Sequence, residues 1–506
     1  MIRRLIGNAG TNLGQLFVRI VVTFIMAPIY LKMMGHYDYG LREIVMAVGG
    51  YMGLLSLGMG PTITRFVSMH YARGERQAVL TVYSCSFFFM FLVGAIIAGV
   101  FWLWGIFFPH TIGGSEGGVY KYMAFLMVVG VQFLFVFPMN VTIFFLEGLQ
   151  LFYLKNIINI FFTIAVAGIC YIYMTPSNAL LLLVGVTTVS AIVRLIVFTR
   201  ILSTSSVGRW NITFTNFSFA KLKEMLLFGS KSFVQGVSSE INDASDRVVI
   251  GSIIGPAAVP TFTIPMTLLG YVNNITMTIT QVFMPMFSDL SAKGQIYRMR
   301  EIYLLASKYV VSVTVAMCVG MSVVGGPFIE IWMPGEFDMQ VVNGIVILLA
   351  CYMALHRLNP FYSHFLTAVN RHGFLAKIMP IGAFVNLAVS IWMVFQIGVL
   401  GAAIGTIVPV FFLVPAALIY CCRNLGIAVT EYIQCSIFPA FLPVLAMSSI
   451  IIWLRLEWGL TSYTRLVLCI LCAVMVFFCV FLLVSCDKEE KALWIRHLRA
   501  MVKPRT

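Results

Sequence analysis

The sequence contains few charged residues. Of 506 residues, 10% are Asp, Glu, Lys or Arg, whereas soluble domains carry about a quarter. Hydrophobic residues make up 60%, and long apolar runs recur along the whole chain. This composition leaves no room for a sizeable soluble domain and predicts an all-α polytopic membrane protein.

The sequence also lacks the patterns that carry metal or covalent chemistry. Its seven histidines are scattered, and no metal-ligand or nucleophile signature appears. The eleven cysteines lie almost entirely within apolar runs, where a thiol acts as a small hydrophobic group. Cys469 and Cys472 have the spacing of a redox pair, but they lie inside a span among leucine and valine. We therefore expect no catalytic residue, no metal site and no enzyme activity.

Fourteen apolar windows are long enough to cross a membrane, because a spanning helix needs roughly 20 mainly apolar residues. They cover about 7–33, 41–59, 81–107, 120–145, 156–174, 178–197, 226–250, 259–284, 303–324, 341–356, 374–396, 400–421, 437–454 and 464–485. With the N-terminus inside, 23 loop and tail lysines and arginines lie on the cytoplasmic side and 5 on the other. This bias predicts that both termini are cytoplasmic. The net charge of +14 thus lies in short loops and the tail, so we expect no nucleic-acid partner.

The two halves of the chain resemble each other at an offset of 220 residues. Segments 34–52 and 254–272 share five identities in nineteen positions, at the outer turn and the helix after it: Gly35 with Gly255, Ile44 with Ile264, Met46 with Met266, Gly50 with Gly270 and Tyr51 with Tyr271. An offset of six spans keeps both halves in the same orientation, as in a parallel repeat about an axis along the membrane normal.

The predicted organisation follows from the repeat. Residues 1–200 form an N-lobe with helices 1–6, residues 201–225 a cytoplasmic linker, and residues 226–425 a C-lobe with helices 7–12. Residues 426–486 hold helices 13 and 14, two extra C-terminal helices outside the repeat. The tail 487–506 mixes Trp494 and its apolar neighbours with six basic residues, which predicts an interfacial helix on anionic lipid.

Charges concentrate in the stretch 238–255, within the seventh span. It carries Glu240, Asp243, Asp246 and Arg247. Residues 240, 243 and 247 share one helix face, and Glu240 falls near the expected bilayer midplane. We assign these four residues to coupling or gating. Asp243 and Arg247 are also spaced as an i,i+4 pair that can neutralise itself.

The first span carries a polar stripe. Asn8, Asn12, Gln15 and Arg19 follow helical spacing on one side, as the lining of a water-filled cavity would. A charge facing hydrocarbon costs around 2.5–3.5 kcal/mol, so Arg19 and Glu240 are expected to face protein or water. A transport pathway between the lobes explains the set; ion pairs that lock the lobes, such as Arg19 with Glu240, explain it too. Lys308 is expected to extend to the membrane surface.

Several segments resemble one family. Tyr39-Gly40-Leu41, Leu57-Gly58 and Arg65-Phe66, then Asp246-Arg247 with Ile250-Gly251 and Gly255, and "MPMFSDL" at 284–290, are similar to the polysaccharide-exporter branch of the multidrug/oligosaccharidyl-lipid/polysaccharide exporter superfamily. "FIEIWMPGEF" and "LTAVNRHGF" add to the resemblance, which covers most of the chain. One position departs from it: Ser56 stands where relatives often carry Asp.

The resemblance implies a flippase with two six-helix lobes around a central cavity that opens alternately to either side. The implied cargo is a polyprenyl-diphosphate-linked oligosaccharide, a repeat unit of surface polysaccharide or lipopolysaccharide, in the bacterial cytoplasmic (inner) membrane. Its diphosphate needs cationic partners, so Arg19 and Lys231 are expected to bind it, with Asn12 and Gln15 beside them. Glu240 and Asp243 would serve a coupling H⁺ or Na⁺. Membrane lipids and other polysaccharide-assembly membrane proteins are the expected partners.

Three other functions fit the same composition. A cation-coupled multidrug exporter shares the architecture but favours an acidic, apolar pocket, against which Arg19 argues. A cell-wall lipid-precursor flippase has fourteen spans and a cationic cavity. A membrane-embedded glycan polymerase or acyltransferase usually needs a substantial outer loop, and no outer loop here exceeds about sixteen residues in this span assignment.

Overall fold

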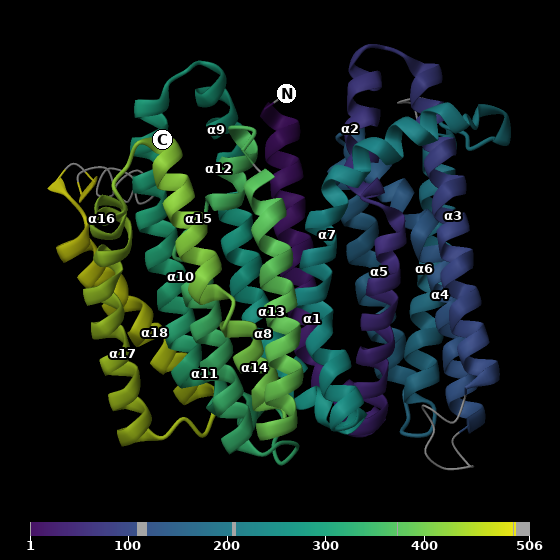
Figure 1. The fold of residues 1–506 in the computed structure, drawn as a ribbon. Helices are drawn as coiled ribbons and strands as arrows, with labels where there is room; N and C mark the ends of the chain where they lie inside the picture. Colours follow the sequence, from purple (N-terminus) through teal and green to yellow (C-terminus); the bar gives the residue numbers. More distant parts are fainter. Residues whose placement is uncertain (1, 109–118, 205–208, 372, 489, 492–506) are drawn as a thin grey trace, which may run out of the picture. The chain divides into compact units, whose positions relative to one another are not determined.

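The computed structural model describes residues 2–108, 119–204, 209–371, 373–488 and 490–491, apart from the side chains of 2–9, 231, 232, 234, 235, 239 and 243. These residues form helices and loops with no strand among them. Contacts within the chain divide it into unit 1, Met1–Pro260, and unit 2, Thr261–Thr506. Both units are drawn in Figure 1.

Unit 1 contains seven numbered α-helices in the described part of the chain. They are α1 (Ile2–Gly53), α2 (Met59–Ala72), α3 (Arg76–Phe107), α4 (Val119–Gly148), α5 (Phe152–Tyr173), α6 (Ala179–Thr204) and α7 (Phe219–Ile253). α1 is kinked at Gly35, whose φ of 72° lies outside the helical region, so it consists of a first limb, 2–34, and a second limb, 36–53. α4 packs against both α3 and α6 (Figure 1).

Unit 2 begins inside α8 (Val259–Thr280). It continues with α9 (Phe283–Ala292), α10 (Ile296–Trp332), α11 (Met339–His356), α12 (Tyr362–Ala368), α13 (Gly373–Ile397), α14 (Leu400–Ile407), α15 (Val410–Leu425), α16 (Val429–Tyr432), α17 (Phe438–Trp458) and α18 (Tyr463–Val480). α10 packs against α11, α17 and α18. Asp338 caps α11 by accepting a hydrogen bond from the Gln340 backbone N–H at 2.9 Å.

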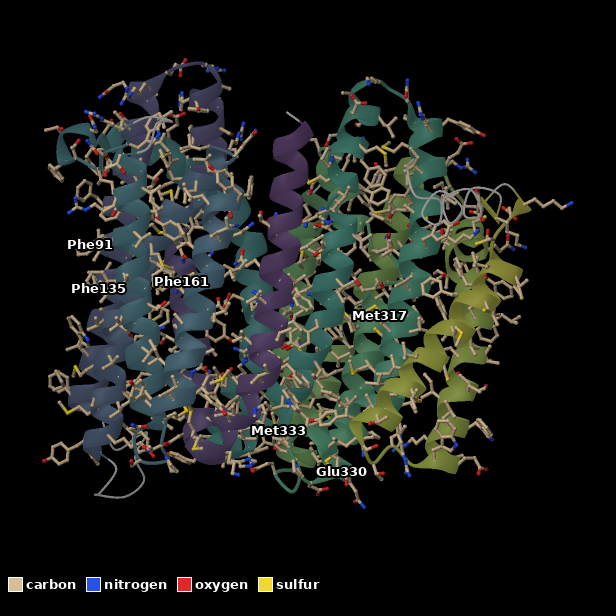
Figure 2. All side chains as sticks on the ribbon, turned by 180° about the vertical axis from the view of Figure 1, so that it is seen from behind. Phe91, Phe135, Phe161, Met317, Glu330 and Met333 are labelled. Carbon is tan, nitrogen blue, oxygen red and sulfur yellow. The ribbon has the colours of Figure 1, made fainter. Side chains whose placement is uncertain are left out.

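The helices agree with a multi-pass membrane protein. Eleven described helical stretches are long and apolar enough to span a bilayer, and one of them, Gly10–Ser56, contains two of the predicted spans. α7 and α8 coincide with two further predicted spans but are too polar for that count. Each of the fourteen predicted windows thus falls on a helix, while the number fourteen stays a prediction. Large apolar side chains such as Phe91 and Phe161 project from the surface of unit 1 (Figure 2), as contact with hydrocarbon favours.

The division between the units differs from the predicted lobes. We placed the linker at 201–225 and gave the seventh span to the second lobe. In the structure α7 lies in unit 1, because it packs against α1, α2 and α3. The crossing with α2 is close: the backbone of Gly58, at the turn before α2, leaves no room for a side chain on Gly229 of α7.

The beginning of α7 is held by polar contacts. The imidazole of His70 lies 2.5 Å through Nδ1 from a carboxylate oxygen of Glu75, and 3.2 Å through Nε2 from the ammonium of Lys221. The hydrogen bond with His70 lowers the pKa of Glu75 below its ordinary value, and the positive charges nearby act in the same direction. This cluster joins α2 to α7.

The backbone repeats at the offset seen in the sequence. α3 begins at Arg76 and α10 at Ile296, 220 residues later. Three pairs of residues with positive φ follow the same offset: Gly35 (72°) with Gly255 (126°), Gly74 (73°) with Gly294 (65°), and Gln150 (61°) with Asn370 (56°). Because positive φ is uncommon for residues other than glycine, the pair Gln150 and Asn370 is specific evidence for repeated halves.

The C-terminal segment is attached to α10. The ammonium of Lys308 lies 2.8 and 3.1 Å from the two carboxylate oxygens of Glu490, and both side chains are buried. Lys308 therefore binds a carboxylate within unit 2, where we expected its side chain to extend to the membrane surface. Most of the predicted interfacial tail, residues 492–506, lies outside the described residues.

Candidate functional site

The polar stripe of the first limb of α1 meets α5. The side-chain amide of Asn156 donates hydrogen bonds to Asn12 Oδ1 at 2.6 Å and Thr11 Oγ1 at 3.1 Å. Asn156 is fully buried, whereas Asn12 and Arg19 are exposed and Gln15 is half-buried. The stripe thus has one member joined to a neighbouring helix, while Arg19 remains accessible to a ligand.

The second limb of α1 packs antiparallel to α7 and brings ionisable groups together. Glu43 Oε2 lies 3.7 Å from a guanidinium nitrogen of Arg247. Two turns further along the limb, Gly50 lies against the carboxylate of Glu240: a Cβ on Gly50 would overlap Oε1 and stand 3.2 Å from Cδ. Residues 43 with 247 and 50 with 240 have the same sum, so one antiparallel register positions both contacts.

The surroundings of this cluster are mixed in charge and partly closed. Arg42 donates a 2.7 Å hydrogen bond to Glu43, which therefore lies between two guanidinium groups. Asp246 is 2% exposed. Tyr51 is close enough to interact electrostatically with Glu240, Asp246 and Arg247. We call Glu43, Glu240, Asp246 and Arg247, with Tyr51, the α1–α7 cluster.

The structure brings together some of the sequence-predicted residues. Glu240, Asp246 and Arg247 belong to the α1–α7 cluster, and their contacts are with the second limb of α1. Arg19 lies on the first limb. The side chains of Asp243 and Lys231 fall outside those described, so the Asp243–Arg247 pair and the assignment of Lys231 stay predictions.

Sequence reasoning missed Glu43 as the partner of Arg247. A signal was present: Glu43 and Gly50 are seven residues apart, as are Glu240 and Arg247, so each pair spans two turns on one helix face. The two helices also run in opposite directions in the predicted topology. Only the register between them was lacking, and it cannot be derived from either helix alone.

The cluster can neutralise and exchange charge. A half-buried carboxylate between two arginines is held ionised, while a carboxylate against apolar backbone is a candidate for proton or cation binding. Among the described residues, no three His, Cys, Asp or Glu side chains form a group suited to hold a metal ion. The chemistry available is therefore ion pairing and proton exchange.

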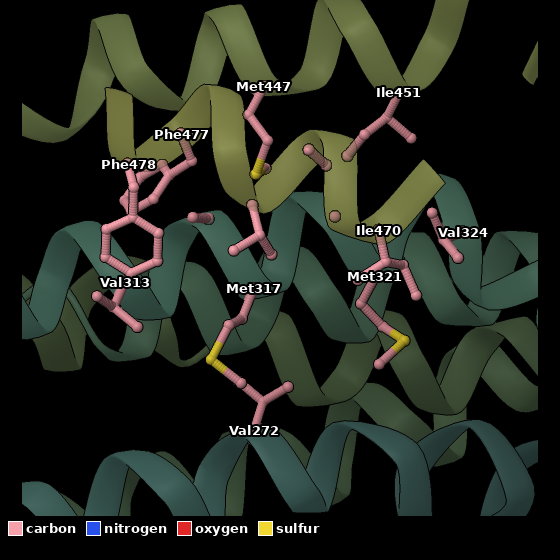
Figure 3. A pocket seen from close by; sticks show the side chains of 14 residues that line it. Val272, Val313, Met317, Met321, Val324, Met447, Ile451, Ile470, Phe477 and Phe478 are labelled. Carbon is pink, nitrogen blue, oxygen red and sulfur yellow. The ribbon is translucent and has the colours of Figure 1, made fainter. Parts of the chain in front are cut away.

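Unit 2 contains an apolar pocket of about 270 Å³ (Figure 3). It is enclosed by α8, α10, α17 and α18, and its lining consists of Val, Ala, Gly, Met, Ile and Phe residues alone. Met317 of α10 projects toward Val272 of α8 at its base, and Phe477 and Phe478 of α18 form one end. Such a lining suits a hydrocarbon chain.

Comparison with known proteins identifies the family and the fold. A family model described as "Polysaccharide biosynthesis protein" matches residues 9–291, more than half of the chain. A protein named as an O-antigen transporter, from Shigella flexneri, is 22% identical over 408 residues, which cover 78% of this chain and 93% of the relative.

Solved structures agree at the level of the fold. An inward-facing multidrug resistance MATE family transporter of the MOP superfamily has a TM-score of 0.66 at 15% identity, covering 82% of this chain and 99% of that one. The lipid II flippase MurJ, in an inward closed conformation, has a TM-score of 0.63 at 14% identity, covering 99% and 100%. A MOP superfamily transporter from Pyrococcus furiosus has a TM-score of 0.60 at 13% identity, covering 84% and 96%.

Proposed function

This chain belongs to the polysaccharide biosynthesis protein family, and on that premise we propose that it is a flippase for a polyprenyl-diphosphate-linked oligosaccharide. It would carry the cargo from the cytoplasmic to the outer leaflet of the bacterial inner membrane by alternating access, with no catalytic step. The excess of lysine and arginine on one side supports cytoplasmic termini. The name of the Shigella relative supports a polysaccharide cargo.

The observation that carries the proposal is the α1–α7 cluster. Its four charged residues lie within helices long enough to span a membrane, where each unpaired charge would cost about 2.5–3.5 kcal/mol. A protein that only needed stable helices would place apolar residues there, because buried ion pairs contribute little net stability. Retained charges within the membrane are typical of transport pathways.

The cargo has three parts with different chemistry. Its diphosphate would bind Arg19 and Lys231, with Asn12 and Gln15 as hydrogen-bonding neighbours; the exposure of Arg19 supports this assignment. Its polyprenyl chain would enter the apolar pocket of unit 2. Its glycan would pass through a hydrated cavity between the lobes. Membrane lipids and other polysaccharide-assembly proteins are the partners that this cargo requires.

Transport would be coupled through carboxylates. Glu240 and Asp243 are the proposed groups for H⁺ or Na⁺, with Asp246 and Arg247 as gating residues. The contact of Glu240 with Gly50 supports a mechanical link, since a change in the charge of this carboxylate acts directly on the backbone of the second limb. Arg247 would change partner between Glu43 and Asp243 during the cycle.

The proposal is tested by complementation in a strain that lacks the gene. We expect that strain to accumulate lipid-linked oligosaccharide in the inner leaflet and to lose surface polysaccharide. Arg19→Gln and Glu240→Gln should restore less than a tenth of the wild-type polysaccharide at equal membrane abundance. Arg423→Gln, which removes an exposed charge at the end of α15, should restore it fully.

Two results would contradict the proposal. Full activity of both Arg19→Gln and Glu240→Gln would remove the site assignment. Normal surface polysaccharide in the deletion strain, combined with increased sensitivity to cationic drugs, would favour the multidrug-exporter function that the same fold also serves.

A further inference from the structure

One pair of repeat-related helices differs in continuity. α4 runs unbroken from Val119 to Gly148. At the offset of 220 residues, the same positions are 339 to 368, which are the first residue of α11 and the last residue of α12. Unit 2 therefore carries the counterpart of α4 as two helices with a break at residues 357–361.

The break lies within the part of the helix that should be in the membrane. Arg357 corresponds to Phe137, which is well inside the predicted span 120–145 and inside α4. Sequence reasoning placed Arg357 in a cytoplasmic loop, because the apolar window ends at residue 356. Irregular backbone at membrane depth is tolerated only where it is buried in protein or lines a cavity, and in transporters it often forms an ion site.

Two buried side chains in the break have N–H groups without an acceptor. Arg357 is 7% exposed; one of its terminal nitrogens donates to the Asn273 side-chain oxygen on α8, but its Nε has no hydrogen-bond acceptor among the described residues. Asn359 is 1% exposed and accepts a hydrogen bond from the Tyr303 hydroxyl, while its Nδ2, beside the Cys421 thiol, has no acceptor in the described part of the chain.

The charge of Arg357 is also without an ion-pair partner. Among the described residues no carboxylate lies within ion-pair distance of its guanidinium. Its electrostatic neighbours are the hydroxyls of Tyr352 and Tyr362 and the thiol of Cys318. His356 adds a further group that disfavours positive charge in its own ring.

A buried guanidinium needs a counter-ion more than it needs a hydrogen bond. Water can accept from Nε, but it cannot neutralise the charge, and unpaired charges are rarely retained in protein interiors. We propose that the break between α11 and α12 binds a small inorganic anion of the size of chloride, with Arg357 as its cation and Asn359 as a second donor.

The size follows from burial. With 7% and 1% exposure, the two side chains are closed off from bulky ligands, so the diphosphate of the cargo and lipid headgroups are excluded. The site lies within unit 2 and is separate from both the α1–α7 cluster and the apolar pocket. It does not depend on the proposed cargo.

The test uses the full-length protein purified in detergent. Its thermal unfolding is followed while chloride replaces gluconate at constant ionic strength. A bound anion stabilises the folded protein by mass action, so each tenfold rise in chloride above Kd should lower the unfolding equilibrium constant tenfold. Bromide should replace chloride, and a crystal soaked in bromide should show anomalous scattering within hydrogen-bonding reach of Arg357 Nε.

Arg357→Met provides the matched variant. It removes the charge and keeps apolar volume, so it should fold in gluconate and show no chloride dependence. Arg423→Met, which removes an exposed charge, should keep the wild-type dependence. If Arg357→Met does not fold, the bromide position in the wild-type protein decides. Equal stability of the wild type in chloride and gluconate, a response to phosphate but not to halides, or bromide bound elsewhere would overturn the proposal.

Discussion

Two adjacent glycines on the second limb of α1 allow the role of Glu240 to be separated from general stability. A Cβ on Gly50 would overlap the Glu240 carboxylate, whereas a Cβ on Gly49 would overlap the ring of Phe133. The Phe133 ring is stacked on Phe101 at a centroid distance of 5.5 Å. One substitution thus displaces the end of a flexible side chain, and the other presses on a packed aromatic layer.

The expected costs in unfolding free energy differ. Glycine to alanine within a helix gains about 1 kcal/mol from backbone propensity. For Gly50→Ala, moving the carboxylate off its rotamer costs about 0.5–1.5 kcal/mol, so the net change should be close to zero. For Gly49→Ala, overpacking costs about 1–3 kcal/mol and exceeds the gain.

Transport should follow the opposite order. If Glu240 must lie against Gly50, its displacement loses an interaction of roughly one hydrogen bond, about 1.5 kcal/mol, which corresponds to roughly a tenfold slower cycle. Gly50→Ala should therefore be stable but slow. Gly49→Ala should be less abundant but normal per molecule.

The assay combines thermal unfolding with flipping of a fluorescent lipid-linked oligosaccharide in proteoliposomes of known protein content. Wild-type flipping by Gly50→Ala, at normal stability, would refute the reasoning, because it would show that the position of the Glu240 carboxylate is not used. A loss of stability equal to that of Gly49→Ala would refute the estimate of its packing.

Three further changes test other contacts. Gly229→Ala should lower the melting temperature and reduce membrane abundance, because its Cβ meets backbone of the turn before α2, whereas Gly236→Ala on the same helix, with nothing within 4 Å, should be neutral or stabilising; equal melting temperatures would contradict the close crossing. Glu490→Gln should cost about 3–5 kcal/mol by leaving the Lys308 ammonium unpaired, and Lys308→Met in the same chain should restore most of it in a double-mutant cycle of unfolding. The lowered pKa of Glu75 means that its contribution to stability is present above the unfolded-state pKa and is lost as pH falls through the folded-state value, so Glu75→Gln should show a smaller loss of melting temperature between neutral and acidic pH than the wild type.

The sequence predicted the spans well because hydropathy and length act locally. The windows 81–107 and 374–396 match α3 and α13 to within a few residues. The turn glycines at 35 and 255 were also visible, since a repeat preserves backbone requirements even where side chains differ. These are properties of single helices and single turns.

What the sequence did not reveal depends on pairs of helices. Glu43 was read as a surface residue until α7 placed Arg247 beside it. Arg357 was read as a loop residue because an interrupted helix and the end of a helix have the same hydropathy profile. Lys308 was expected to reach water, since its partner lies 182 residues further along the chain. In each case the deciding contact is remote in sequence.

The difference between α4 and the α11–α12 pair has a consequence for how the duplicated halves evolved. Both copies retained the same turns, so the backbone plan was inherited intact. Only the second copy gave up a continuous helix for an arginine among tyrosines, and a gene assembled from two first copies would keep the architecture but lose that polar interruption. Whatever cycle the protein performs, its two halves cannot perform it as equivalents.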